Sequence, residues 1–432
     1  MRYWPSFHYK HEEGGAAMAR TSDAVVIGSG AFGGSVAFHL IQRGLNNVIL
    51  LDQHDIGSQT SARAAGNAAQ ARGHQLMAAV ARDAVERFLR FTDETGQPLD
   101  FVQSGSLALS WTEAGAEMLT SLHEVAGESG LETALVTPRE AHELSPMLDA
   151  EGASAILYTP SDLYLEPAQL PLAYAAAVRA RDGTLLPQTK VTGILRDGDV
   201  VRGVATERGD IQAPIVVDAA GGWARDVAAQ AGFQIPLVPV RHQLLVTEPV
   251  EGFDSSQPIV RFSDLNAYLR PSLGGVLLGA YEQDPLVVDP ASRGWNFVVG
   301  DLPLDREMLV RMATTIAPRF SPLRDLNGRI REVRGGIPTM TPDGFPLVGP
   351  VPGADGLYAI AGCCVGGFSI SPTLGALLAD SIVGVPTGGF DLAPMAIDRF
   401  GSDWDQRWLV DRSLREYSLV YDLRDTVDGS AT

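Results

Sequence analysis

Three glycines, Gly28, Gly30 and Gly33, have the spacing of a loop that binds the phosphates of a dinucleotide. In such a loop the first glycine makes a tight turn, the second lets a pyrophosphate approach the backbone, and the third lets the next helix pack closely on the strand. The apolar run 24–27 precedes them and is typical of a buried parallel strand. Asp52 ends the next apolar run, where a carboxylate binds the ribose hydroxyls of an adenine nucleotide. This order of elements predicts an adenine dinucleotide site.

Three further segments of small residues are candidate ligand contacts. Residues 57–75 are small, polar and interrupted by glycine, so their amides can approach a planar ligand closely, although a plain surface loop is the alternative. Residues 219–224 (AAGGWA) follow a buried strand and precede a helix, as in a second nucleotide contact at the edge of a sheet. Ser371 and Pro372 favour the start of a helix, and the amino end of a helix binds anions.

The remaining periodicities predict the elements that must position these segments. Helices are expected over 76–91, 113–127 and 166–181, among apolar runs typical of buried strands. Segment 235–300 differs, because it contains short strands separated by turns at regular spacing. We expect it to form an antiparallel sheet that roofs a cofactor and supplies a substrate pocket.

Composition excludes several classes of protein. A chain of 432 residues is too long for one small core, and no run approaches the roughly 20 apolar residues of a membrane span. The formal charge of −19 argues against nucleic acid and anionic membrane as partners. The two cysteines, Cys363 and Cys364, are adjacent, which suits neither a disulfide framework nor a metal site. We therefore expect a cytoplasmic protein without a metal, in which residues 1–20 form a flexible leader that lacks the apolar core of a signal peptide.

Five motifs in this order resemble the D-amino-acid oxidase (DAO) superfamily of flavoproteins, near the branch of sarcosine and dimethylglycine oxidases and dehydrogenases. They are the glycine loop with Asp52, the segments SARAAGN and AAGGW, then TPDGFPLVG and GGFSISPTLG, which together span about 24–380. The resemblance implies an α/β fold: a Rossmann-like FAD/NAD(P)-binding domain with a discontinuous antiparallel-sheet substrate domain. It also implies FAD, and hydride removal from a carbon beside an amine.

The resemblance also assigns residues to the cofactor. The glycine loop would hold the pyrophosphate, Asp52 the ribose, and the glycines near residue 366 would border the flavin. A helix amino end would point at the pyrimidine end of the flavin, where reduction places negative charge. The implied cofactor-binding residues are Gly28, Gly30, Ala31, Phe32, Gly33, Asp52, Gln53, Thr60, Ser61, Arg63, Gly66, Asn67, Val191, Ala219, Ala220, Gly221, Trp223, Gly336, Asp343, Gly366, Gly367, Phe368 and Ser369.

The chain departs from its relatives where they tether FAD or hold the substrate. Some relatives attach FAD through a cysteine that corresponds to Gly336, and others through a histidine that corresponds to Arg63. Both tethers are missing, which predicts non-covalent FAD. The carboxylate anchors of amino acid oxidases correspond to Pro338 and Ser369, and the lysine that promotes oxygen reaction corresponds to a position near Leu277. These absences favour a dehydrogenase, or an oxidase that activates oxygen differently.

Flavin oxidation of an amine needs little acid–base machinery, and no catalytic triad is evident. The resemblance places Tyr268 on the substrate side, and Tyr281 near the position of a catalytic histidine in relatives. Arg270 would share the strand face of Tyr268 and bind an acidic or carbonyl group, with an ion pair as the alternative. His242 is a candidate for proton transfer or substrate binding, with a hydrogen-bonded core histidine as the alternative.

Three functions remain open at this point. The first is oxidation of a secondary or tertiary amine or an N-substituted amino acid to an imine that hydrolyses, the second is oxidation of a 2-hydroxy acid or another C–OH substrate, and the third is a non-catalytic flavin-fold subunit. The enzyme would take a small-molecule substrate and pass electrons to oxygen or a redox partner, and its oligomeric state is left open. The expected domains are the FAD-binding domain at 21–75, 150–225 and 330–395, the substrate domain at 76–149 and 226–329, and a C-terminal tail at 396–432.

Overall fold

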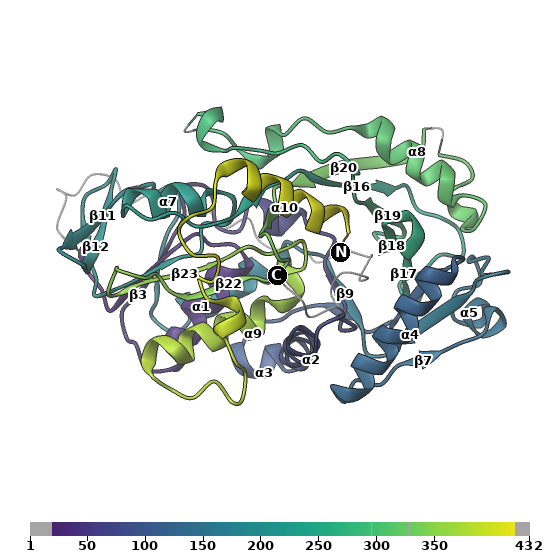
Figure 1. Ribbon diagram of the computed structural model, residues 1–432, viewed down its shortest axis with the longest axis horizontal. Helices are drawn as coiled ribbons and strands as arrows, with labels where there is room; N and C mark the ends of the chain where they lie inside the picture. Colours follow the sequence, from purple (N-terminus) through teal and green to yellow (C-terminus); the bar gives the residue numbers. More distant parts are fainter. Residues whose placement is uncertain (1–19, 295, 327, 420–432) are drawn as a thin grey trace.

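Two sheets organise the chain, and the computed structural model describes residues 20–294, 296–326 and 328–419. In Figure 1 a helix-covered sheet lies on the left, the second sheet lies on the right, and helix α10 (Gln406–Ser418) crosses between them. The leader expected at 1–20 lies outside the described residues except for Arg20. No helix in the described part of the chain is long and apolar enough to cross a membrane.

The first sheet has six strands in the order β10-β3-β2-β14-β23-β22. Its pairs are parallel except for the antiparallel edge pair β22–β23, as expected for a doubly wound nucleotide-binding sheet. Its strands alternate their side chains between two cores: Val26 faces one and Val25 faces the other. The strands are β2 (Ala24–Ile27), β3 (Val48–Leu51), β10 (Thr184–Leu186), β14 (Ile215–Asp218), β22 (Leu347–Pro350) and β23 (Leu357–Ala361).

Different layers cover the two faces of this sheet. One core contains residues from α1 (Ala31–Gln42), α2 (Gln75–Leu89), α6 (Gln169–Arg179) and α9 (Gly367–Val383). The opposite core contains residues from helix α7 and a small sheet in the order β1-β13-β12-β11. The elements of this second layer are β1 (Arg20–Thr21), β11 (Val191–Asp197), β12 (Val200–Thr206), β13 (Ile211–Gln212) and α7 (Ala224–Gln230).

The second large sheet has eight strands in the order β20-β16-β19-β18-β17-β6-β8-β7. All its pairs are antiparallel except β17–β6, which confirms the antiparallel sheet expected from segment 235–300. Its strands are β6 (Ser106–Ser110), β7 (Ala134–Leu135), β8 (Ala155–Thr159), β16 (His242–Thr247), β17 (Ile259–Phe262), β18 (Ala267–Ser272), β19 (Gly275–Ala280) and β20 (Ile330–Gly336).

Helices and two small sheets complete the substrate side. The core of the eight-stranded sheet includes residues of α5 and α8, and α4 packs on β8. The small sheets have the orders β4-β9-β5 and β15-β21. The elements are α3 (Phe91–Thr95), α4 (Glu113–Glu128), α5 (Pro138–Leu144), α8 (Arg306–Ile316), β4 (Asn67–Ala68), β5 (Phe101–Val102), β9 (Leu163–Leu165), β15 (Val238–Pro239) and β21 (Thr339–Met340).

Three of the expected domain boundaries need correction. Helix α2 was expected in the substrate domain, but Val80, Val85 and Phe88 lie in the core of the nucleotide-binding part. Strands β8 and β20 were expected in the FAD-binding domain, but they pair with β6 and β16 in the eight-stranded sheet. Packing decides the assignment of α2, and strand pairing decides those of β8 and β20. An apolar pattern in the sequence does not indicate which element a helix or strand will contact.

Helix α9 begins earlier than Ser371 and Pro372 predicted. Its amino cap is Gly366, and Pro372 lies inside the helix. A proline there lacks the N–H that would bond to the Phe368 carbonyl four residues earlier. The Ser371 hydroxyl donates to that carbonyl instead, at 3.0 Å. A local hydrogen bond therefore replaces the missing one, and the helix extends one further turn toward the cavity described below.

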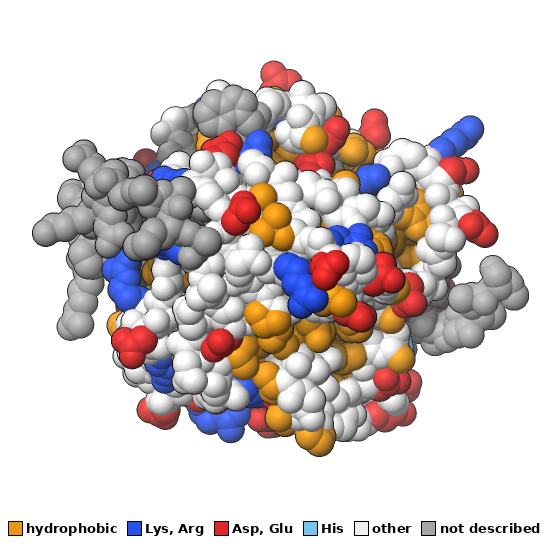
Figure 2. All heavy atoms as spheres, turned by 90° about the vertical axis from the view of Figure 1, so that its left-hand side faces the viewer, with side chains coloured by type: hydrophobic (Ala, Val, Ile, Leu, Met, Phe, Trp, Pro, Cys, Tyr) orange, Lys and Arg blue, Asp and Glu red, His pale blue; other side chains and the backbone are white. Residues whose placement is uncertain are grey.

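The face of the molecule in Figure 2 shows how charge is distributed there. Acidic and basic side chains lie next to one another, with hydrophobic side chains between them. The net negative charge is therefore not concentrated into a single patch on this face.

Candidate functional site

A cavity of about 830 Å³ extends from the first sheet to the second. Its lining includes the glycine loop after β2, the segment 57–67, the segment 219–223 after β14, the start of α9, and side chains of β17 and β18. Segments far apart in the sequence therefore meet around one space, and the carboxyl ends of parallel strands form one end of it, where ligands of such sheets bind.

The glycine loop has the close approaches that its motif predicts. Gly28 has φ of 98°, a conformation that favours glycine, and a Cβ there would lie 2.5 Å from the Ala219 carbonyl oxygen. A Cβ on Gly33 would lie 1.8 Å from the carbonyl oxygen of Gly28. Asp52 lines the cavity, and one of its oxygens accepts from the Ser29 amide at 2.8 Å and the Ser29 hydroxyl at 2.7 Å. The carboxylate that we expect to bind the ribose is thus held against the glycine turn.

Asp218, at the end of β14, is a buried carboxyl beside this loop. Its Oδ1 accepts from the Ala220 amide, while Oδ2 has no hydrogen-bond partner among the described residues. Burial raises the pKa of Asp218 to about 8, and the charge of Asp226 adds to the effect. Because the pKa of Asp218 is higher in the folded than in the unfolded state, its contribution to the free energy of unfolding is most favourable at low pH. This contribution falls as the pH rises toward 8.

We therefore expect Asp218→Asn to stabilise the protein at pH 8 by about 2 kcal/mol, because the amide avoids the burial of a charge. The gain should shrink steadily as the pH is lowered and vanish below about pH 3, where the carboxyl is protonated in both the folded and the unfolded state. Urea unfolding of the wild type and the variant across this range measures it. A gain that is constant with pH would show that ionisation of Asp218 is not responsible.

The segment after β3 supplies polar groups to the middle of the cavity. The turn η1 (Thr60–Arg63) is held by Ser61, whose Oγ accepts from the Ala31 amide at 3.0 Å. Arg63 Nε and Asn67 Oδ1 are buried and have no hydrogen-bond partner among the described residues, although both residues line the cavity. Polar atoms in this state are satisfied when a polar ligand binds beside them.

The start of α9 borders the same space. Gly366, Gly367, Phe368 and Ser369 line the cavity, so the positive end of the helix dipole lies beside it. Arg72 donates to the Ser369 hydroxyl at 3.0 Å and also lines the cavity. This end of the cavity is therefore electropositive and suited to an anionic group.

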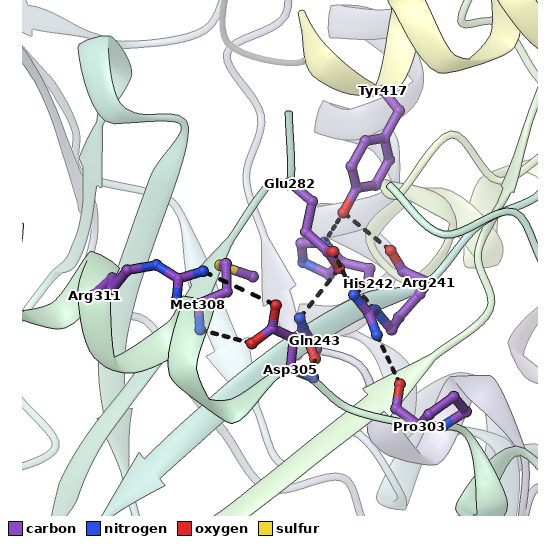
Figure 3. Close-up of polar contacts among 9 residues, drawn as sticks. All are labelled: Arg241, His242, Gln243, Glu282, Pro303, Asp305, Met308, Arg311 and Tyr417. Atoms are coloured by element: carbon purple, nitrogen blue, oxygen red, sulfur yellow. Dashed lines mark hydrogen bonds and ion pairs between the residues drawn. The ribbon is translucent and has the colours of Figure 1, made fainter. Parts of the chain in front are cut away.

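Four aromatic side chains cluster where the cavity meets the second sheet. His242 is buried, with Nε2 2.9 Å from the Tyr268 hydroxyl. Its Nδ1 lies 2.9 Å from the Tyr417 hydroxyl, and this contact is drawn in Figure 3. The Tyr281 ring packs on the imidazole, with 4.7 Å between centroids. Burial lowers the pKa of His242 to about 4, so the imidazole is neutral at pH 7. His242, Tyr268 and Tyr281 line the cavity.

The structure brings most of the sequence-predicted residues together and leaves three outside the lining. Gly33 lies behind the glycine loop, where the absence of a side chain allows close packing against Gly28. Asp343 pairs with Arg399 at 2.8 Å and holds the turn of residues 341–345. Every other residue expected to bind the cofactor, together with Tyr268, His242 and Tyr281, lines the cavity.

Arg270 is the third, and its placement corrects the expectation of a substrate-binding arginine. The side chain is fully buried beneath the cavity wall, paired with Glu166 at 3.1 Å and placed over the Tyr164 ring. It donates to the carbonyl of Ala65 at 2.7 Å and approaches that of Leu165 at 3.4 Å. Although Tyr268 and Arg270 share a strand face, the 64–67 loop covers Arg270. The guanidinium therefore supports the loop that carries Arg63 and Asn67.

We expect Arg270→Met to destabilise the protein by about 3 kcal/mol and to weaken FAD retention. The substitution leaves Glu166 and the loop carbonyls without their partner, and breaking a buried pair by removing one member is costly. Urea unfolding and the ratio of flavin to protein after dialysis measure the two effects. Arg139→Met, which removes an exposed pair with Glu143, is the matched control and should change neither quantity. Normal stability of Arg270→Met would show that the buried pair does not hold the loop.

Sequence reasoning missed three site residues. Tyr417 comes from the tail, whose aromatic residues gave no indication of which side would be buried. Arg72 was seen only as part of the small-residue segment 57–75. Arg261 lines the cavity from β17, is paired with Asp162 at 3.1 Å, and has an Nε without a hydrogen-bond partner among the described residues. The spacing of Ile259 and Arg261 on one face of a strand was the available signal.

Comparison with known proteins identifies the family. Residues 23–381 match the family described as DAO, FAD dependent oxidoreductase. The chain belongs to the DAO family of FAD-dependent oxidoreductases. Its fold agrees with the L-proline dehydrogenase from P. horikoshii, with a TM-score of 0.79 and 27% identity over 89% of this chain and 98% of that one.

Two curated relatives are much longer than this chain. It is 29% identical to 4-methylaminobutanoate oxidase (formaldehyde-forming) of Paenarthrobacter nicotinovorans, over 89% of this chain and 46% of the relative. It is 31% identical to the mitochondrial sarcosine dehydrogenase of Homo sapiens, over 93% of this chain and 44% of the relative. The chain therefore spans less than half the length of these two relatives.

The lining of the cavity fits the FAD of this family. The Gly28–Gly33 loop leaves space for a pyrophosphate, Asp52 is placed for a ribose, and Arg63 and Asn67 have unsatisfied atoms for a polar ligand. At Gly336 a Cβ would lie 2.9 Å from the Thr60 methyl group. Gly336 and Arg63, which occupy the positions expected for the FAD tethers of relatives, both line the cavity. Non-covalent binding of FAD remains a prediction. The part of the chain that is described contains no cluster of His, Cys, Asp and Glu placed to hold a metal ion.

Proposed function

We propose that the protein oxidises the carbon beside the nitrogen of a secondary or tertiary amine that carries a carboxylate, giving an imine that hydrolyses. The observation that carries the proposal is the pair Tyr268 and His242, which places a neutral hydrogen-bonding group on the cavity wall. A neutral imidazole does not repel an ammonium group, whereas an imidazolium would. Relatives such as dimethylglycine dehydrogenase and 4-methylaminobutanoate oxidase support the same substrate class.

Each group in the cavity has a distinct part in this proposal. FAD, when bound, accepts the hydride. Tyr268 orients the nitrogen, and Tyr281 packs behind His242 and keeps the cluster in place. Arg72 and Arg261 both line the cavity and supply positive charge for the substrate carboxylate.

An electron acceptor, a cellular location and an oligomeric state complete the proposed function. Electrons leave to oxygen or to a redox partner, because every flavin cycle requires an acceptor. A reducing, cytoplasmic location suits Cys363 and Cys364, which are both free. Assembly into an oligomer is compatible with the proposal and is not required by it.

Anaerobic flavin bleaching tests the proposed function. We expect purified protein to be yellow, to release FAD on acid treatment, and to bleach when sarcosine, N,N-dimethylglycine or 4-methylaminobutanoate is added. Lactate serves as the 2-hydroxy acid control and should leave the spectrum unchanged. Bleaching by lactate alone would replace amine oxidation with oxidation of a C–OH substrate. No bleaching by any amine or hydroxy acid would favour a non-catalytic flavin-fold subunit.

A further inference from the structure

The hydroxyl of Tyr417 joins two groups that lie next to each other in the sequence. It is 2.9 Å from His242 Nδ1 and donates to the carbonyl oxygen of Arg241 at 3.2 Å. Tyr417 is fully buried and comes from α10, at the end of the described chain, whereas His242 begins β16. Figure 3 shows the ring descending from the last helix onto this strand.

The directions of these hydrogen bonds follow from the number of protons available. A carbonyl oxygen only accepts, and a tyrosine hydroxyl has a single proton. The proton of Tyr417 therefore points to Arg241, where it satisfies a partly buried carbonyl. The Tyr417 oxygen must then accept from His242, so Nδ1 of the imidazole carries the hydrogen. In a neutral imidazole the other nitrogen, Nε2, has none.

The same reasoning extends to the cavity. Because Nε2 of His242 has no hydrogen, it accepts from the Tyr268 hydroxyl, 2.9 Å away. This interaction uses the single proton of Tyr268. Toward a ligand in the cavity, the oxygen of Tyr268 can then act only as an acceptor.

We propose that Tyr417 is a positioning residue that fixes the Nδ1–H tautomer of His242 and thereby makes Tyr268 an obligate acceptor for the N–H group of the substrate amine. The tautomer assignment stands on the hydrogen bonds alone, and the role toward the amine rests on the proposed function. An acceptor at this position binds an ammonium group or a secondary amine and disfavours ligands that present only acceptors. Helix α10 thus contributes to substrate recognition without touching the substrate.

The surroundings of His242 favour the neutral imidazole. The titratable groups packed against it are the hydroxyls of Tyr268 on β18, Tyr281 after β19 and Tyr417 on α10, with the thiol of Cys364 in the same apolar cluster. The neighbouring residue Arg241 makes a forked ion pair with Glu282, with Nε to Oε1 at 2.9 Å. Burial keeps the pKa of His242 at about 4.

A supporting network keeps Arg241 and its carbonyl in place. Gln243 donates to Glu282 at 3.1 Å, and the amide of Asp305 donates to Gln243 at 2.8 Å. Asp305 in turn caps α8, because its carboxylate accepts from the Met308 amide. Figure 3 shows this chain of contacts running from α8 to Tyr417. The residue whose carbonyl sets the direction of the Tyr417 proton is therefore linked to α8 by a continuous set of hydrogen bonds.

Nitrogen NMR of the holoenzyme tests the tautomer directly. With ¹⁵N-labelled histidine, two-bond correlation spectra distinguish an imidazole protonated at Nδ1 from one protonated at Nε2, and His242→Gln assigns the signal. We expect the wild type to show the Nδ1–H form at pH 7. An Nε2–H form in the wild type would overturn the proposal without any further variant.

Tyr417→Phe tests the consequence for the substrate. The variant keeps the ring in its apolar cluster and removes the acceptor of the Nδ1 hydrogen, so we expect the Nδ1–H preference to be lost. The apparent Kd for N,N-dimethylglycine in anaerobic flavin reduction should rise about tenfold, because a hydrogen bond to a charged group is disrupted. Ser418→Ala removes the neighbouring hydroxyl of α10, which contacts the carbonyls of Gln283 and Leu414, and should change neither result.

The outcomes separate the inference from the proposed function. A Tyr417→Phe variant that melts normally but keeps both the Nδ1–H tautomer and the wild-type Kd would refute the role of Tyr417. If no amine bleaches the wild-type flavin while His242 is in the Nδ1–H form, the proposed function fails and the tautomer assignment is supported.

Discussion

Replacing Gly33 with alanine is expected to leave the protein without bound FAD. A Cβ on Gly33 would lie 1.8 Å from the carbonyl oxygen of Gly28, which belongs to the backbone of the phosphate-binding turn. That backbone cannot yield freely, because Gly28 itself packs against Ala219 and Ala220 at the end of β14. The methyl group therefore forces α1 away from β2 or distorts the turn, and overpacking of this kind costs about 3 kcal/mol.

The ratio of flavin to protein after gel filtration and the melting temperature measure the effect of Gly33→Ala. We expect loss of most of the flavin absorbance together with a lower melting temperature. Gly127→Ala is the matched control, because Gly127 also lies in a helix, α4, but nothing stands within 4 Å of its added Cβ. Alanine suits a helix better than glycine, so this control should be neutral or slightly stabilising. Full flavin content in Gly33→Ala would contradict the close-packing role of the third glycine.

Removing the Tyr268 hydroxyl is expected to slow flavin reduction by about 100-fold, the range for a positioned group that acts on a proton or hydrogen bond in the reaction. Tyr268→Phe removes the atom that His242 holds toward the cavity. A β-carbon on Gly279 would lie 2.3 Å from the Tyr268 hydroxyl, so the strand opposite leaves room for this ring. The hydroxyl therefore has a defined position that the phenylalanine ring cannot replace.

Anaerobic stopped-flow reduction with N,N-dimethylglycine gives the limiting rate for Tyr268→Phe. Flavin content should equal that of the wild type, because the hydroxyl bonds to His242 and not to the loops that hold the cofactor. Tyr158→Phe removes a hydroxyl from β8 of the same sheet, outside the cavity lining, and should leave the rate unchanged. A limiting rate within twofold of the wild type for Tyr268→Phe would remove this tyrosine from the proposed chemistry.

The sequence by itself determined the nucleotide-binding half of the site. Gly28, Gly33 and Asp52 belong to one βαβ unit, so their spacing along the chain fixes their geometry with little help from the rest of the protein. The segment 57–67 and residues 219–223 also line the cavity, because each lies after a strand of the parallel sheet. Strands of such a sheet end at one edge, so local patterns are sufficient to bring these segments together.

Only the tertiary structure decided the substrate half. Arg270 and Tyr268 occupy one strand face, yet the loop at 64–67 covers the first and leaves the second on the cavity. Tyr417 reaches His242 from a helix that follows it by more than a hundred residues, and α9 begins before Ser371 because a side-chain bond replaces the one lost at Pro372. Strand order, loop coverage and helix docking depend on contacts distant in sequence, which neither periodicity nor motif spacing encodes.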